Sequence, residues 1–354
     1  MPAQQSSNSD RLRIEIIGEG DATAHRVDIL AGEFARAGHV VSVRRPDAPP
    51  SDSLADVVHA HGWAAVTAVG VPREAALIAS LDPPGPGLDP FAVTIGQAYD
   101  RIIAPSSDEV RDLLAVGLRR DRIAVVPDGV DPVIYNAGPK GPGLRAEPRS
   151  RRVLCVLPAL VPELLFDAMI ALRRVPDARL YVAGGPPAPR LRRDPDAREV
   201  AAAARRIGVA SRIVLVGRVP PERRPDLYRS ADLVICTGEP DSARVALEAM
   251  ACAVPVAAFA EGAVADIITH GVCGVLVERG NSYALAEAVR SLLASEPRRY
   301  ALGVAGLSRV QERFTWSRVA EQTEGIYRSV LADRHDRPSA DLAGGVVGDA
   351  VLDS

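Results

Sequence analysis

Two histidines at alternating positions form the clearest pair of side chains that could do chemistry. His59 and His61 end the apolar segment ADVVHAH (55–61), which is expected to form a strand. Because successive side chains of a strand point to opposite faces, both imidazoles are expected on one face of the sheet. An HxH pair could bind a metal ion, but no third ligand is in view, and we predict no metal site. His61 is instead a candidate catalytic residue.

A glycine turn follows the first apolar segment of the chain. LRIEIIGEG (12–20) ends on Gly18 and Gly20 and leads into a helical pattern over 21–39. Glycines at such a turn allow a ligand to approach the backbone, although any junction of a strand with a helix can use one. Gly20 is therefore a candidate binding residue, on weak evidence of its own.

Arginine supplies almost all of the positive charge. The chain has 354 residues, 42 of them basic, and a formal net charge of -3, and Lys140 is the only lysine. A phosphate site must therefore use arginine, backbone N–H groups or helix N-termini. Because there is no global basic field, we expect no nucleic-acid partner, whereas peripheral contact of a local basic rim with a membrane surface stays open.

The cysteines and the N-terminus point to a reducing compartment. The four cysteines, Cys155, Cys236, Cys252 and Cys273, form no C-x-x-C pair and lie among apolar or small residues, so we expect buried free thiols. The N-terminal segment MPAQQSSNSDRLR lacks an apolar signal core. No apolar run approaches the roughly 20 residues that span a bilayer. We expect a cytoplasmic protein.

These candidate residues are embedded in two successive runs of alternating strands and helices. The first run ends before a segment rich in Gly, Pro and charge at 136–150, and the alternation restarts at Arg152. A strand, a helix and a further strand in succession indicate parallel sheets, so we predict an α/β fold with two Rossmann-like, doubly wound domains. The predicted strands are 12–20, 40–45, 55–61, 75–80, 101–106, 122–130, 152–158, 179–185, 211–219, 232–237, 254–259 and 273–280; the predicted helices are 21–39, 107–117, 162–174, 197–208, 225–231, 242–252, 282–295 and 315–331.

This alternation sets the expected domain limits. We predict a disordered N-terminus (1–10), an N-terminal domain (11–135), a linker (136–150), a C-terminal domain (151–314), a last amphipathic helix (315–331) and a disordered tail (332–354).

Five segments in register resemble one enzyme family. The chain resembles the family 4 glycosyltransferases, which include sucrose-phosphate synthase and mycothiol-pathway glycosyltransferases; the segments are APSSDEVRDLLAVGLRRDRIAVVPDGVDPVIY, RLYVAGGPP, SRIVLVGRVPPERRPDLYRSADLVICT, ALEAMACAVPVAAF and HGVCGVLVERG. The resemblance implies the glycosyltransferase B fold, with two domains facing across a cleft and the last helix crossing back onto the first domain. It implies retaining transfer from a nucleoside-diphosphate sugar, bound mostly by the C-terminal domain, to an acceptor on the N-terminal domain. Neither a metal nor a cofactor is implied.

The resemblance assigns roles to two glutamates. Glu248, in LEAMA, corresponds to the acid that binds the ribose hydroxyls of the nucleotide, since one carboxylate can accept both protons of a vicinal diol. Glu239 is the candidate catalytic acid at the sugar, although it lies nine positions before Glu248 and Pro240 stands at the family's usual spacing of eight. A shift of the loop could present Glu239, or Asp241 could replace it.

The cations of the family pattern are missing. The family places an arginine and a lysine after the first strand of the C-terminal domain, but VLCVLPALVPELL (153–165) contains neither. A contact of this kind contributes a few kcal/mol to the transition state. Arg218, next to Gly217 at a strand end, and Arg244 are the candidate replacements for binding the diphosphate.

The N-terminal domain also departs from the family. His25 is the counterpart of the histidine that follows the family's glycine turn, whereas ALIASLDPPGPG (76–87) lacks the usual loop histidine and offers Asp82 as its nearest polar residue. The sequence is thus compatible with an active retaining glycosyltransferase or with an inactive homologue that serves as a binding or partner subunit. An epimerase of the same fold lacks a specific match. The donor, the acceptor and the oligomeric state stay open.

Overall fold

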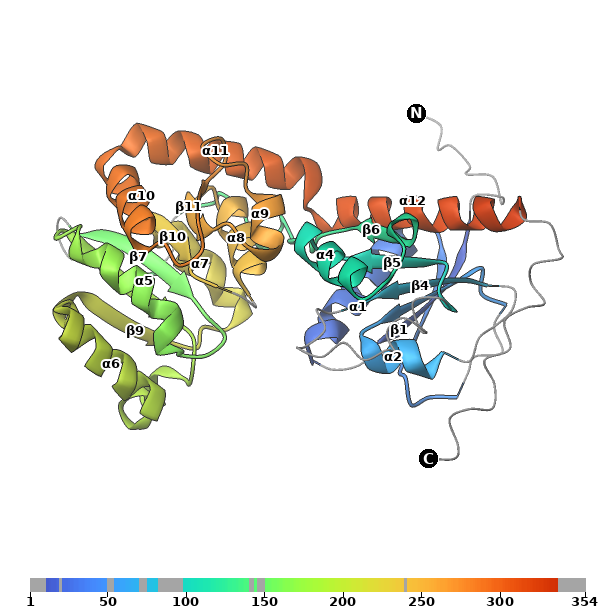
Figure 1. Cartoon of the computed structure of the whole chain (residues 1–354), viewed down its shortest axis with the longest axis horizontal. Coiled ribbons are helices and arrows are strands. Elements are labelled where there is room, and N and C mark those ends of the chain that lie inside the picture. The colour runs from blue at the N-terminus through green and yellow to red at the C-terminus, as the bar shows by residue number, and fades with distance from the viewer. Residues whose placement is uncertain are drawn as a thin grey trace. The chain divides into compact units, whose positions relative to one another are not determined.

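The computed structural model describes residues 11–18, 21–49, 54–69, 75–81, 98–139, 143–144, 150–238 and 241–336, with the backbone alone for residues 21–24, 63 and 68. Gly20, Asp82 and Glu239 lie outside the described residues. The chain divides into two compact units. The first contains the residues up to Val126 and those from Val319, and the second spans Pro127–Arg318 (Figure 1).

The first unit is built on a six-stranded sheet in which every strand pairs in parallel with its neighbours. The strand order reverses between β1 and β3, which makes this a topological switch point. Helices α2 and α4 pack on one face through an apolar cluster, while α1 and α12 lie on the other. In spatial order the strands are β2 (Val40–Arg44), β1 (Arg13–Gly18), β3 (Val57–His61), β4 (Ala76–Ser80), β5 (Arg101–Ala104) and β6 (Ile123–Val125); the helices are α1 (Asp21–Arg36), α2 (Trp63–Ala68), α4 (Ser107–Ala115) and α12 (Trp316–His335).

The second unit repeats the design with a second six-stranded parallel sheet. Its strand order reverses between β7 and β10, so the predicted doubly wound topology is confirmed in both units. The strands are β12 (Val275–Val277), β11 (Val256–Phe259), β10 (Leu233–Cys236), β7 (Arg151–Val156), β8 (Ala178–Ala183) and β9 (Ile213–Gly217); the helices are α5 (Pro162–Arg173), α6 (Pro195–Ile207), α7 (Arg224–Ser230), α8 (Ser242–Ala251), α9 (Gly262–Ile267), α10 (Ser282–Ala294) and α11 (Glu296–Arg313).

Among the described residues, three α-helices were not predicted from the sequence: α2, α9 and α11. The first two have six residues each, too few to show a helical period. Helix α11 has 18 residues but carries glycines in its interior, which lower helix propensity. Close packing explains them, because a Cβ on Gly303 would lie 2.2 Å from the carbonyl oxygen of Ala253 and one on Gly306 would lie 3.2 Å from the Met250 side chain.

The predicted linker does not separate the two units. The division falls at Val126 and Pro127, before the predicted segment 136–150, and the second unit ends at Arg318 rather than at 314. Tyr135 and Leu144 are buried in the core of the second unit, and the Leu144 N–H donates to Ser230 Oγ at 2.8 Å. The described residues Tyr135 and Leu144, beside and within the predicted linker, therefore pack as part of the second unit.

The last helix is longer than predicted. Helix α12 runs from Trp316 to His335, so residues 332–335 continue the helix rather than begin the predicted tail. Its end is tied to the first unit by Arg334, whose NH1 lies 2.7 Å from Asp100 Oδ2. From Val319 onward the helix belongs to the first unit.

Candidate functional site

Each unit presents one sheet edge suited to ligands. In open parallel α/β sheets, ligands bind beyond the carboxyl ends of the strands, at the point where the strand order reverses. In the first unit this point lies beyond Gly18 and His61, which pair across β1 and β3. In the second unit it lies beyond Val156 and Cys236, the last residues of β7 and β10. Three of the predicted residues, His61, Gly217 and Arg218, lie at strand ends along these edges.

His59 and His61 lie together on one face of the first sheet, as the alternation predicts. Their ring centroids are 4.0 Å apart, and both side chains are at least 98% buried. His59 Nδ1 is 2.6 Å from the hydroxyl oxygen of Tyr327 on α12, and His59 Nε2 is 2.8 Å from Ser80 Oγ at the end of β4. His59 is thus a structural residue that joins the sheet to the last helix.

His61 lies one pair nearer the carboxyl edge and has a different environment. Its Nε2 atom is buried and has no hydrogen-bond partner among the described residues. Burial, together with the charge of Arg26 and the neighbouring ring of His59, holds the pKa of His61 well below its usual value of 6.5. The imidazole is therefore neutral at physiological pH, with one ring nitrogen as a donor and the other as an acceptor. Gly18, which pairs with His61, has no room for a side chain, because a Cβ there would lie 2.7 Å from Val27 Cγ2.

Glycine loops shape the edge of the second sheet. Gly184 and Gly185 follow β8 with φ of 147° and 70°, and Gly217 ends β9 with φ of 81°. The Gly184 N–H donates to the Gly217 carbonyl at 3.0 Å, and the Arg218 N–H donates to the Pro186 carbonyl at 3.1 Å. The loops after β8 and β9 therefore form one interlocked surface at the carboxyl edge.

We expect Gly217→Ala to distort this surface. A Cβ on Gly217 would lie 2.8 Å from the Ala188 nitrogen and 2.9 Å from the Pro186 oxygen, so backbone must move. Gly208 is a matched control, because its φ is 82° but nothing lies within 4 Å of its Cβ position. Gly208→Ala should cost about 1–2 kcal/mol of stability for the backbone conformation alone. Gly217→Ala should cost a further ~1–3 kcal/mol through the clash, as measured by urea unfolding. Equal losses in the two variants would show that the loops tolerate the added atom.

Glu248, on the second turn of α8, has a carboxylate with a hydrogen-bond donor on each oxygen. Only 6% of its side chain is exposed. Tyr228 donates its hydroxyl proton to Glu248 Oε2 at 2.7 Å, and Arg244 NH1 donates to Glu248 Oε1 at 2.9 Å. Burial, followed by the charge of Glu248, raises the pKa of Tyr228 well above 10, so the phenol remains a donor. The carboxylate that the resemblance assigns to the ribose hydroxyls is already bonded on both oxygens.

The predicted cations differ in their environment. Arg218 is exposed, and its Nε lies 3.3 Å from the Gly185 carbonyl oxygen. Arg244 joins Glu248 and, through NH2 at 2.8 Å, Asp241. Burial alone would lower the pKa of Arg244, but the charges of Glu248 and Asp241 outweigh it and raise that pKa.

Arg224 was missed by the sequence analysis. It is the first residue of α7, and its NH1 lies 3.7 Å from Glu248 Oε1. Arg224 Nε also donates to the Val219 carbonyl at 3.4 Å, next to the loop after β9. A charged residue at a helix start inside the matched segment SRIVLVGRVPPERRPDLY was the available signal.

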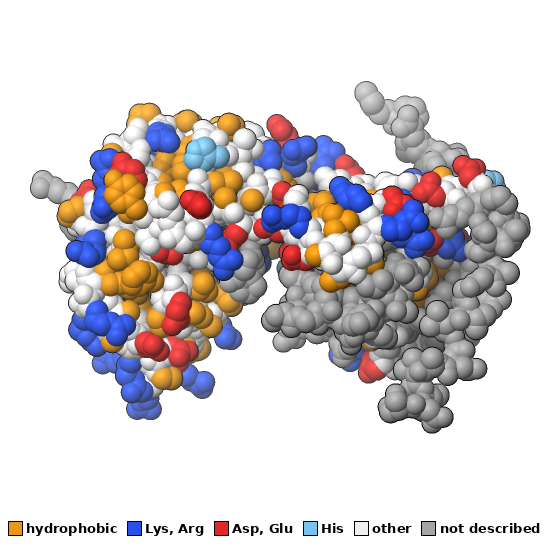
Figure 2. All heavy atoms as spheres, in the orientation of Figure 1, with side chains coloured by type: hydrophobic (Ala, Val, Ile, Leu, Met, Phe, Trp, Pro, Cys, Tyr) orange, Lys and Arg blue, Asp and Glu red, His pale blue; other side chains and the backbone are white. Residues whose placement is uncertain are grey.

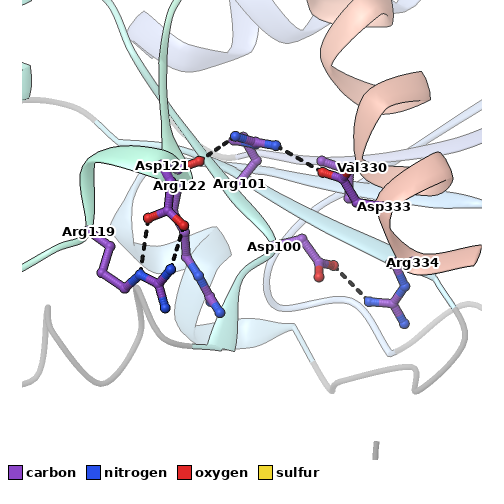
Figure 3. A pocket seen from close by; sticks show the side chains of 8 residues that line it. All are labelled: Asp100, Arg101, Arg119, Asp121, Arg122, Val330, Asp333 and Arg334. Atoms are coloured by element: carbon purple, nitrogen blue, oxygen red, sulfur yellow. Dashed lines mark hydrogen bonds and ion pairs between the residues drawn. The ribbon is translucent and has the colours of Figure 1, made fainter. Parts of the chain in front are cut away.

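The first unit also holds a cavity of about 350 Å³ at the opposite edge of its sheet. Three of its four arginines pair with aspartates, Arg334 with Asp100, Arg119 with Asp121 and Arg101 with Asp333 (Figure 3), and Arg122 donates to the Tyr99 carbonyl at 3.0 Å. The cavity is lined by Asp100, Arg101, Arg119, Asp121, Arg122, Val330, Asp333 and Arg334.

Other kinds of site are not found in the part of the chain that the structure describes. No group of three or more His, Cys, Asp or Glu side chains is arranged to hold a metal ion. None of the described helices is sufficiently long and apolar to span a membrane. All four cysteines are buried free thiols, as expected from their sequence contexts.

Comparison with known proteins places these features in context. Residues 157–295 match the family model described as glycosyl transferases group 1. The D-inositol 3-phosphate glycosyltransferase of Xylanimonas cellulosilytica is 31% identical over 332 residues, covering 83% of this chain and 77% of the relative. The enzyme of the same name from Thermobispora bispora is 31% identical over 324 residues, covering 83% and 75%.

Solved structures share the fold at low identity. Sucrose-phosphate synthase from Thermosynechococcus elongatus superposes with a TM-score of 0.69 at 18% identity, covering 91% of this chain and 100% of the other. Anabaena HepE in complex with UDP and glucose gives a TM-score of 0.66 at 19% identity, covering 90% and 100%.

Proposed function

The chain belongs to the group 1 glycosyltransferases and has the glycosyltransferase B fold, and we propose that it moves a sugar from a nucleoside-diphosphate sugar to an acceptor with retention of configuration. These matches confirm that the five sequence segments indicate a glycosyltransferase of group 1, and they are consistent with family 4. The observation that carries the proposal is the carboxyl edge of the second sheet. There the loops after β8 and β9 interlock beside positively charged side chains.

We place the donor along this edge, from Gly217 and Arg218 to the start of α8. Strands β9 and β10 are separated by β7 and β8, so their ends lie about 14 Å apart at the usual strand spacing. The N-terminus of α8 contributes a partial positive charge for phosphate. Arg244 and Glu248 belong to this proposed donor site, and Glu239 keeps its proposed role at the sugar.

We place the acceptor at the carboxyl edge of the first sheet. The buried, unpartnered Nε2 of His61 supports this, because a neutral imidazole can hydrogen-bond a hydroxyl group or a water that binds there. Gly20, in the turn after β1, would give the ligand access to the backbone.

Calorimetry with UDP, GDP and ADP tests the donor half of the proposal. One of these nucleotides should bind, and UDP is the first choice because HepE was solved with it. Turnover is then measured with the matching nucleotide sugar and D-inositol 3-phosphate, the compound named for the relatives. The anomeric configuration of the product, read by NMR, tests retention. Binding without turnover by any sugar or acceptor would contradict an active enzyme.

The inactive homologue is the second candidate, and specific observations favour it. Segment 153–165 contains no Arg or Lys, and the first turn of α5 that follows β7 carries Glu163 instead. A diphosphate held there would meet a negative charge. Such a subunit should not bind UDP, GDP or ADP even when the nucleoside diphosphate is present at millimolar concentration. The same calorimetry tests this outcome.

A further inference from the structure

Two arginines from different helices converge on one carboxylate oxygen in the second unit. Arg244 of α8 and Arg224 of α7 both face Glu248 Oε1, at 2.9 and 3.7 Å. We infer that Arg224 and Arg244 together bind the diphosphate of the donor, and that Glu248 is a positioning residue that holds them. The inference rests on the proposed function, because it names the groups that supply the charge missing from segment 153–165.

The exposure of the three side chains supports this division of roles. Arg244 is 34% and Arg224 is 25% exposed, whereas Glu248 is 6% exposed. A ligand that arrives from solvent therefore meets the guanidinium groups before it meets the carboxylate. The other carboxylate oxygen, Glu248 Oε2, accepts a hydrogen bond from the Tyr228 hydroxyl.

Both arginines lie at the edge where the donor is proposed to bind. Arg224 opens α7 and Arg244 is in the first turn of α8, and each helix starts beyond the carboxyl end of a strand. Arg224 reaches back to the Val219 carbonyl, so it lies beside the loop that carries Arg218. The pair thus lies between the loop after β9 and the start of α8.

Their hydrogen-bonding capacity is only partly used. A guanidinium has five N–H donors, which match phosphate oxygens in a forked geometry. Arg224 uses its Nε for the Val219 carbonyl and its NH1 for Glu248, and its side chain also interacts with the side chain of Tyr135. The local charges are two arginines against Glu248 and Asp241, and only Glu248 is deeply buried. Phosphate oxygens can therefore bind the pair without removing Glu248.

The test compares a nucleoside diphosphate with its monophosphate and its nucleoside, using the base that the wild type prefers. Arg224→Gln and Arg244→Gln should each raise the Kd of the diphosphate at least tenfold and change that of the nucleoside less than twofold. Arg206→Gln is the matched control, since this exposed arginine lies at the end of α6 on the opposite edge of the sheet. It should leave all three values unchanged.

A second measurement separates positioning by Glu248 from direct binding of ribose. Glu248→Gln should weaken binding of the nucleoside diphosphate. The ratio of the Kd of the nucleoside diphosphate to the Kd of its 2′-deoxy analogue should stay as in the wild type. A ratio that moves toward one in Glu248→Gln would show that Glu248 contacts the ribose directly, and it would overturn the positioning role. Unchanged diphosphate affinity in both arginine variants would overturn the inference and leave the proposed function standing. Absence of any nucleotide binding by the folded wild type would overturn both.

Discussion

Glu248→Gln should lower the free energy of unfolding of the second unit by about 3 kcal/mol. Removing one partner of a buried ion pair leaves the other charge uncompensated, at a cost of about 3–5 kcal/mol. We expect the lower end of this range of free energies because the Arg224 and Arg244 side chains are partly exposed to solvent. The neutral amide also weakens the hydrogen bond that Tyr228 now donates to a carboxylate at 2.7 Å.

Urea unfolding followed by circular dichroism measures this loss. Glu287→Gln is the matched control, because Glu287 also pairs with an arginine of its own helix, Arg290, but its side chain is 43% exposed. An exposed pair of this kind contributes far less to stability than a buried one. Comparable losses in the two variants would show that the carboxylate of Glu248 is not the centre of a buried cluster.

The first unit should lose stability as the pH falls below about 6.5. Burial, with a contribution from Arg26, lowers the pKa of His59 to about 3, and the pKa of His61 is also well below 6.5. The unfolded chain therefore binds protons between pH 6.5 and 3 that the native state does not bind. The stability contributed by the neutral rings is fully present above pH 6.5 and is lost as the pH falls toward 3. For His59, linkage gives a loss of about 2–3 kcal/mol between pH 6 and pH 4, and the depressed pKa of His61 adds a loss of the same sign.

Unfolding free energies measured across this range in constant ionic strength test the effect. His61→Gln should reduce the slope by about half, since one depressed site is removed. His25→Gln, at an exposed position on α1, is the control and should leave the slope unchanged. An identical pH dependence in wild type and His61→Gln would show that folding does not lower the pKa of His61.

The architecture was predictable because its signal is local. Apolar runs of strand length alternate with helical patterns, and each can be recognised within about ten residues. The same local rules failed at α11, where Gly303 and Gly306 weaken the helical pattern. Those glycines serve contacts with Ala253 and Met250, some 50 residues away in the chain, which no local window contains.

Some features of the candidate site could likewise be predicted from the sequence, whereas others required the tertiary structure. The sequence alone determined two doubly wound domains, His59 and His61 on a single face, and a cation shortage in segment 153–165. Only the tertiary structure decided what surrounds Glu248, because Tyr228 and Arg224 reach it from another helix, whereas Arg244 lies one turn away on α8. It likewise decided that Tyr327 meets His59 across 268 positions of chain. Periodicity is a property of neighbouring residues, whereas the partners of a buried charge are set by how helices pack on a sheet.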